Sequence, residues 1–262
     1  MARILITGST DGLGLMAAQL LAQQGHTVAL HARNDTRARD AHAALPDNAG
    51  IAVGDLSSIA QTRDVAAQVN DLGTFDAVIH NAGVGYYGRG RVETEDGLSD
   101  VFAVNVLAPY LLTALITPPR RLVYLSSGMH HSGDPTLRDP QWATRPWQGS
   151  QAYSESKFHV TALMLAVARK WPQVLSNAVD PGWVATKMGG SGATDDLRLA
   201  PVTQAWLAAG DDAEALVTGR YFHHQQPRRP HPATQSPEVQ DRLLAYCADL
   251  TEVELPTAVS AD

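Results

Sequence analysis

The sequence is short of cysteine and of positive charge. Cys247 is the single cysteine among 262 residues, which excludes an internal disulfide and a zinc site built on cysteines, and which fits a reducing compartment. Lysine and arginine number 20 against 27 aspartate and glutamate, for a formal net charge of −7. Because the basic residues form no stripe, we expect no nucleic-acid partner.

Long apolar runs and metal-ligand patterns are also absent. No uninterrupted apolar stretch approaches the length needed to span a bilayer. The first apolar strand begins within three residues of Met1, so no signal peptide is expected before it. The pairs His130-His131 and His223-His224 have no carboxylate or cysteine to complete a metal site, and we expect no metal. The expectation is a cytoplasmic protein without a membrane anchor.

Strand-like and helix-like patterns alternate along the chain. Apolar, β-branched runs predict strands at 3–6, 27–31, 51–53, 75–80, 121–125, 174–179 and 218–222. Apolar residues at helical spacing predict helices at 13–24, 36–45, 57–70, 99–115, 153–170, 201–209 and 238–250. Such alternation predicts an α/β fold, a single Rossmann-like doubly wound parallel sheet of about seven strands with helices on both faces.

A glycine cluster joins the first strand to the first helix. The spacing is Thr7-Gly8-x-x-x-Gly12-x-Gly14. Glycines let a backbone approach a pyrophosphate, and a helix N-terminus supplies free N–H donors and partial positive charge. The alternative is a glycine-rich turn that binds nothing. The cofactor-binding residues predicted here are Gly8, Ser9, Thr10, Gly12, Leu13 and Gly14.

The next two strands end at residues that could select the nucleotide. The second strand ends in Ala32-Arg33 rather than in an acidic residue. A guanidinium suits a ribose 2′-phosphate, so Arg33 predicts NADP(H) rather than NAD(H), unless it is a solvated surface side chain. The third strand ends before Asp55-Leu56, where the carboxylate could accept from an adenine amino group or simply stabilise a turn.

Polar residues follow the later strands at the same edge of the sheet. Asn81-Ala82-Gly83 leaves room for a cofactor, and Asn81 could brace the glycine turn. Asn105 lies inside an apolar helix, where its amide needs partners, whether for function or in a local kink. Tyr153 and Lys157 are four residues apart and share one helix face.

These motifs occur in a fixed order along the chain, together with Ser127 and Pro181-Gly182-x-x-x-Thr186. As an ordered set, they resemble the short-chain dehydrogenase/reductase family over residues 3–222. The stretches 126–131 and 219–222 resemble its retinol-dehydrogenase-like branch. That branch handles lipophilic carbonyls or alcohols with NADP(H). Because we expect no N-terminal membrane anchor of the kind that this branch carries, the resemblance implies a lipophilic or natural-product carbonyl rather than a retinoid.

The resemblance also implies roles for single residues. Tyr153 would be the general acid/base, Lys157 its partner, Ser127 the donor to the substrate oxygen and Asn105 the proton relay. An ammonium beside a phenol favours the phenolate, which supports the pairing of Tyr153 with Lys157. Further cofactor contacts are implied for Tyr153, Lys157, Pro181, Gly182, Val184 and Thr186, in addition to Arg33, Asp55, Leu56, Asn81, Ala82, Gly83 and the glycine turn.

The remaining predictions concern substrate contacts, domain organisation and oligomeric state. Trp183 and His130 could line the substrate mouth, although either could equally serve packing or loop structure. One NADP(H)-binding domain over 1–262 is expected, with substrate loops near 128–150 and 183–200 and a C-terminal helical extension at 223–262. The resemblance implies a homodimer through the helices that carry Asn105 and Tyr153, and the altered C-terminal region disfavours a tetramer.

The predicted function is therefore NADP(H)-dependent interconversion of a carbonyl and an alcohol on a small molecule. The alternative is a non-catalytic NADP-binding sensor or interaction protein on the same fold. An epimerase or dehydratase of the extended branch would carry a different glycine spacing, and a methyltransferase would not explain Tyr153 with Lys157.

Overall fold

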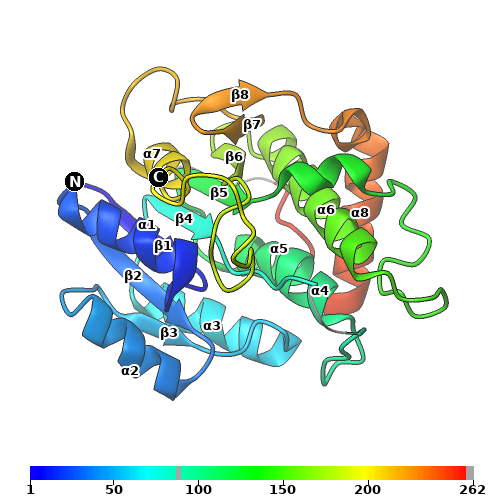
Figure 1. Cartoon of the computed structure of the whole chain (residues 1–262), viewed down its shortest axis with the longest axis horizontal. Helices are drawn as coiled ribbons and strands as arrows, with labels where there is room; N and C mark the ends of the chain where they lie inside the picture. Colours follow the sequence, from blue (N-terminus) through cyan, green and yellow to red (C-terminus); the bar gives the residue numbers. More distant parts are fainter. Residues whose placement is uncertain (87–89, 258–262) are drawn as a thin grey trace.

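The computed structural model, which describes residues 1–86 and 90–257, has one eight-stranded sheet in the order β3-β2-β1-β4-β5-β6-β7-β8 (Figure 1). All neighbours are parallel except β7 and β8, which are antiparallel. The strands are β1 (Arg3–Ile6), β2 (Thr27–Ala32), β3 (Ile51–Val53), β4 (Ala77–His80), β5 (Arg121–Leu125), β6 (Leu175–Asp180), β7 (Arg220–His223) and β8 (Gln226–Arg228). The predicted doubly wound parallel sheet is confirmed, with one strand more than expected.

Helices cover both faces of the sheet because strand residues alternate between two cores. Ile4 and Ile6 pack with α1 (Gly12–Gln23), α2 (Asp35–Ala44) and α7 (Val202–Ala209). Leu5, between them, faces the other core. That second core is built by α3 (Ile59–Asp71), α4 (Asp100–Phe102), α5 (Ala108–Leu115), α6 (Gly149–Lys170) and α8 (Pro237–Thr251).

Several boundaries differ from the prediction. The expected helix over 99–115 is interrupted by a π-helical turn at Ala103–Leu107, which contains Asn105. Helix α6, which carries Tyr153, begins at Gly149, four residues before that tyrosine. The predicted loop 223–236 contains β8 and a 3-10 turn at Pro232–Gln235, because His224 and Gln225 adopt positive φ and form a tight hairpin.

The C-terminal extension packs on the helices that carry the predicted catalytic residues. Helix α8 lies along α6, with Leu243 and Cys247 fully buried (Figure 1). Beyond it, Tyr110 of α5 donates to the carbonyl of Val253 at 2.6 Å, and Trp171 donates to the carbonyl of Pro256 at 2.7 Å. The extension therefore packs on α5 and α6, the helices through which the homodimer is predicted, and the dimer itself stays a prediction. Residues 258–262 of the extension lie outside the described part.

Neither a membrane-spanning helix nor a metal cluster occurs in the part of the chain that the structure describes. Within 1–86 and 90–257, none of the helices combines the length and the apolar character that crossing a bilayer requires. The same residues contain no group of three or more histidine, cysteine, aspartate and glutamate side chains arranged to hold a metal ion.

Candidate functional site

The glycine turn is held tightly against the end of β4. The side-chain amide of Asn81 donates to the carbonyls of Thr7 (2.9 Å) and Gly8 (3.1 Å). A Cβ atom on Gly14 would lie 2.4 Å from the Gly8 carbonyl oxygen, so no larger residue fits there. Gly12 has φ +53° and open space where its side chain would be. The turn thus combines close packing below with an open face above, as a phosphate cradle requires.

The N-terminus of α1 has no side-chain cap. Asn34 and Ser58 accept hydrogen bonds from the first turns of α2 and α3, whereas the Asp11 side chain accepts none from α1. Its carboxylate instead lies 2.6 Å from Arg37 and 2.8 Å from Lys187. The first-turn N–H groups are therefore left for an acceptor outside the helix, such as a cofactor phosphate.

His31, which the sequence reasoning missed, supports the glycine turn from below. Its Nδ1 accepts the N–H of Gly8 at 3.0 Å, so Nε2 carries the proton and donates to the carbonyl of Gly54 at 2.9 Å. Burial lowers the pKa of His31, which keeps the ring neutral. The signal was present in the sequence, since a histidine inside an apolar strand needs partners.

Two arginines lie near the nucleotide end of the cradle. The predicted Arg33 is exposed at the end of β2. Arg37, one turn further on, donates to Thr10 Oγ1 at 2.9 Å and contacts Asp11. Arg37 was missed because only the fold brings α2 against the glycine turn. At the end of β3, the Asp55 carboxylate accepts the N–H of Ser57 at 2.9 Å, and Leu56 is buried.

Helix α6 carries Tyr153, which lines the central pocket, and Lys157, which is buried next to it. The Nζ atom of Lys157 lies 5.5 Å from the centre of the Tyr153 ring and donates to the carbonyl of Leu125 at 2.9 Å. Burial lowers the pKa of Lys157 to about 8, and the negative charge of Asp180 opposes that shift. The ammonium is therefore within reach of the phenol, as the predicted pairing requires.

Asn105 is fixed by the π-helical turn at the edge of the same cleft. Its Oδ1 accepts the N–H of Val84 at 2.8 Å, and its Nδ2 donates to the Val84 carbonyl (3.1 Å) and to Ser156 Oγ (3.0 Å). A Cβ atom on Gly83 would lie 3.3 Å from Asn105 Oδ1 and 3.6 Å from Lys157 Nζ. Gly83 therefore separates the amide from the ammonium, and Ser156 is an anchor that spacing alone did not reveal.

The two serines after β5 face different surroundings. Ser126 Oγ is buried and bonds Thr161 Oγ1 of α6 at 2.8 Å. Ser127 is half-buried and lines the central pocket. Behind it, His130 donates from Nδ1 to the Ser127 carbonyl (2.7 Å) and accepts the N–H of His231 at Nε2 (3.0 Å). The structure thus places His130 behind the pocket rather than at its mouth, because both ring nitrogens bind backbone atoms.

A pocket of about 530 Å³ opens at the carboxyl edge of the sheet. It contains Ser127 and Tyr153, and Trp183 stands at its rim with 48% of its surface exposed. Among the described residues that line the pocket, the apolar ones are Leu13, Tyr86, Met129, Pro181, Trp183, Val184 and Met188. The polar ones include Thr186, Asp180, Asp195 and His223. The Pro181-Gly182 turn needs glycine at its second position, since Gly182 has φ +84° and a Cβ there would lie 2.6 Å from Asp195.

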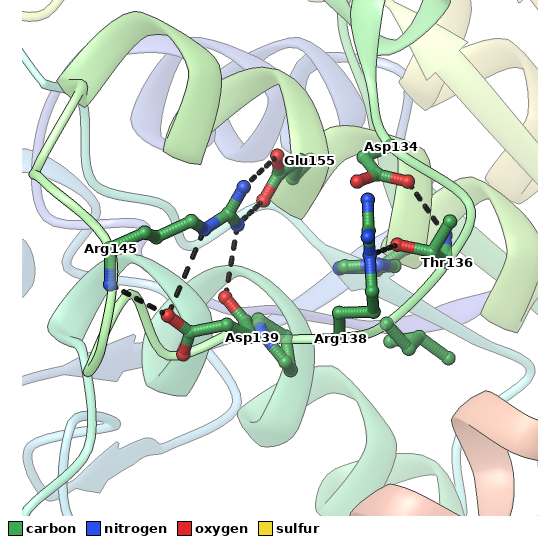
Figure 2. A pocket seen from close by; sticks show the side chains of 9 residues that line it. Asp134, Thr136, Arg138, Asp139, Arg145 and Glu155 are labelled. Atoms are coloured by element: carbon green, nitrogen blue, oxygen red, sulfur yellow. Dashed lines mark hydrogen bonds and ion pairs between the residues drawn. The ribbon is translucent and has the colours of Figure 1, made fainter.

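A second cavity, of about 110 Å³, lies on the other side of α6 (Figure 2). In Figure 2, Arg145 reaches from the connecting loop to Glu155 of α6 and to the backbone carbonyl of Asp139, the latter at 2.9 Å. Glu155 also accepts from Trp142 Nε1 at 3.1 Å. The buried His159 lines this cavity, and neither of its ring nitrogens has a partner among the described residues. These contacts fasten the loop before α6 to the helix that carries Tyr153.

Comparisons with known proteins agree with this geometry. A sequence model of a protein family, described as short chain dehydrogenase, matches residues 2–196. Short-chain dehydrogenase chyC of Penicillium rubens is 44% identical over 260 residues, covering 98% of this chain and 100% of that protein. Human retinol dehydrogenase 13 is 29% identical over 289 residues, covering 97% of this chain and 86% of that protein. The crystal structure of a blue fluorescent protein from a metagenomic library, in complex with NADPH, matches with a TM-score of 0.67 at 22% identity, covering 85% of this chain and 95% of that one.

Proposed function

Because the chain belongs to the short-chain dehydrogenase/reductase family, we propose that it is an NADP(H)-dependent oxidoreductase that interconverts a carbonyl and an alcohol. The observation that carries this proposal is the approach of Lys157 Nζ to 5.5 Å from the Tyr153 ring centre, in a cleft that also holds Ser127. A non-catalytic nucleotide-binding protein would have no need of this set.

The residues present fit a nicotinamide dinucleotide. The open face of Gly12 and the uncapped first turn of α1 would hold the pyrophosphate, and Thr186, Val184 and the Pro181-Gly182 turn would hold the nicotinamide end. The cofactor supplies the hydride. The preference for NADP(H) is supported by two cations near the cradle, Arg33 and Arg37, and by the absence of an acidic residue at Ala32. The solved neighbour that carries NADPH points the same way.

The side chains would divide the remaining work. Ser127 would donate a hydrogen bond to the substrate oxygen as negative charge develops there. Tyr153 would give a proton to that oxygen during reduction and take it back during oxidation. Lys157, buried and held by Leu125, would supply the positive charge that favours the ionised phenol. Asn105 would keep the backbone of Val84 in place beside Lys157, in the family's proton-relay position.

The pocket supports a lipophilic substrate. Tyr86, Met129, Trp183 and Met188 offer apolar surface around the acid–base pair. A small, largely apolar carbonyl compound would bury that surface, and the NADPH pool of a cell would favour its reduction. Trp183, at the rim, is the predicted residue best placed to contact it.

The test is the Tyr153→Phe variant. Removal of the general acid should lower turnover by about 10²- to 10⁴-fold, while NADPH binding, measured by quenching of protein fluorescence, stays unchanged. Tyr246→Phe is the matched control, because it removes a hydroxyl from α8, away from the cleft. Equal turnover in Tyr153→Phe would remove the assigned role. Cofactor binding by the wild type, without turnover of any ketone or aldehyde in a broad panel, would favour the non-catalytic alternative.

A further inference from the structure

A carboxylate faces the reaction pocket without a role in hydride or proton transfer. Asp180 is the last residue of β6 and lines the pocket that holds Ser127 and Tyr153. Resting on the proposed carbonyl reduction, we propose that Asp180 selects the substrate. It would favour neutral or cationic ketones that carry a hydrogen-bond donor, a hydroxyl, N–H or ammonium, close to the reacting carbonyl.

The carboxylate is held in place from the protein side. Its Oδ1 accepts the N–H of Gly182 at 3.0 Å, in a turn whose positive φ only glycine adopts readily. Its Oδ2 lies 3.5 Å from Nδ1 of His223, which has no hydrogen-bond partner among the described residues. The hydroxyl of the buried Tyr221 also lies close enough to interact with this carboxylate. Because an ionised carboxylate offers about four acceptor positions, Asp180 retains accepting capacity toward the pocket.

Oδ2 also lies beside Gly128, the residue that follows Ser127. A Cβ atom on Gly128 would lie 3.2 Å from this oxygen. Any larger residue at position 128 would therefore press against the Asp180 carboxylate. Because Ser127, Gly128 and Asp180 line the same pocket, a donor close to a carbonyl bound by Ser127 would meet Asp180.

The charge of the pocket points to the same class of substrate. Its described lining contains two carboxylates, Asp180 and Asp195, and no lysine or arginine. Asp195 is already used, since its Oδ2 accepts the N–H of Trp183 at 2.7 Å. The buried Lys157 lies behind this lining, next to Tyr153. An anionic substrate in the pocket would therefore meet two carboxylates, whereas an ammonium or hydroxyl would meet an acceptor.

The apolar wall makes the selection effective. The side chain of Asp180 is 16% exposed, and a substrate body packed on Tyr86, Met129 and Trp183 would remove its remaining water. A ketone without a donor would leave that carboxylate unpaired, which sites of this kind reject strongly. A ketone with a donor replaces the lost water.

The experiment compares aryl ketones that differ only in the group next to the carbonyl: methyl, hydroxymethyl, aminomethyl or carboxylate. For the wild type with NADPH, we expect kcat/KM to be at least about tenfold higher for hydroxymethyl and aminomethyl than for methyl, and lowest for carboxylate. In Asp180→Asn, the aminomethyl-to-methyl ratio should fall by about tenfold or more, and the carboxylate ketone should gain.

The readout is the ratio of kcat/KM between two ketones. Loss of the Asp180 charge also acts on Lys157, but this effect is the same for every ketone and cancels in the ratio. Asp195→Asn is the matched control: it removes the other carboxylate of the pocket and should leave the ratios unchanged. Turnover of the methyl ketone without a preference for donors, or equal ratios in Asp180→Asn and wild type, would overturn this inference alone. Turnover of no member of the series, with turnover of other ketones or aldehydes in the broad panel, would also overturn this inference alone. Turnover of no compound in either set would overturn the proposed function and this inference with it.

Discussion

The ammonium of Lys187 lies 2.8 Å from the carboxylate of Asp11, although 176 residues separate them in the chain. The contact joins the loop after β6 to the glycine turn and so bridges the two sides of the cofactor cleft. The hydrogen bond from Lys187 is the leading cause of the lowered pKa of Asp11. Because Lys187 is 84% exposed, the pair can break and reform with little cost, as a closure over a cofactor must.

We therefore expect Lys187→Met to speed the release of NADPH. The pair is solvent-exposed, so the effect should be small, about two- to fivefold, and should vanish at high salt. Stopped-flow fluorescence at low and high ionic strength measures it. Lys170→Met is the control, since that lysine pairs with Asp241 far from the cleft. Identical NADPH release rates for wild type and Lys187→Met at low salt would show that the Lys187–Asp11 pair does not retain the cofactor.

The arginines at the cradle should set the choice of cofactor. Arg37→Met and Arg33→Met are each expected to raise KM for NADPH by about tenfold and to leave KM for NADH unchanged, because only NADPH carries the 2′-phosphate. Steady-state kinetics with both cofactors measures the split. Arg39→Met, on the exposed side of α2, is the matched control. A parallel loss for both cofactors would show that these side chains support the turn and do not read the phosphate.

Local patterns explain why much of the architecture could be predicted. The glycine turn, the apolar strands and the Tyr153–Lys157 spacing are each set by residues close in sequence, so periodicity and turn chemistry suffice. The π-helical turn at Asn105 also follows a local cue, a buried amide in an apolar helix, but its partners Val84 and Ser156 come from other elements.

What the sequence could not show depends on long-range contact. The ring of His130 meets the backbone of His231, 101 residues away, and this pairing puts it behind the pocket. Arg37 reaches Thr10 only once α2 packs beside the glycine turn. Asp180 lies next to Gly128 and His223 only because β5 and β7 flank β6 in the sheet. The roles of the individual site residues stay predictions for the variants described above.

The ion pair in Figure 2 should matter for stability. Glu155 is nearly buried, with 4% of its side chain exposed, and Arg145 is its counter-charge. Glu155→Gln should lower the free energy of unfolding by about 3 kcal/mol, because the partly buried Arg145 loses its closer carboxylate and keeps only that of Asp139, at 3.9 Å. Urea denaturation measures this. Asp241→Asn breaks the exposed Arg169–Asp241 pair and should cost less than about 1 kcal/mol. Equal losses in the two variants would show that burial of the Glu155 pair has no special weight.

Buried histidines should make the fold sensitive to acid. Burial lowers the pKa of His80 to about 3, and of His130 and His159 to about 4, from the usual 6.5. As pH falls through 6.5 the unfolded chain takes up protons on these residues, whereas the folded chain does not until the lower values are reached. The stabilisation is therefore complete above 6.5 and is lost between 6.5 and about 4, by about 1.4 kcal/mol per pH unit for each histidine.

The variant His159→Gln isolates one of these contributions. Glutamine cannot take up the proton, so the slope of unfolding free energy against pH, measured by urea titration between about pH 6 and pH 4.5, should fall by about 1.4 kcal/mol per unit. A loss of stability from the substitution itself shifts the curve without changing that slope. His42→Gln, on the exposed surface of α2, should keep the wild-type slope. If His159→Gln keeps the wild-type slope, then the imidazole of His159 is protonated in the folded protein over this pH range. The cavity that His159 lines would then accommodate the charge.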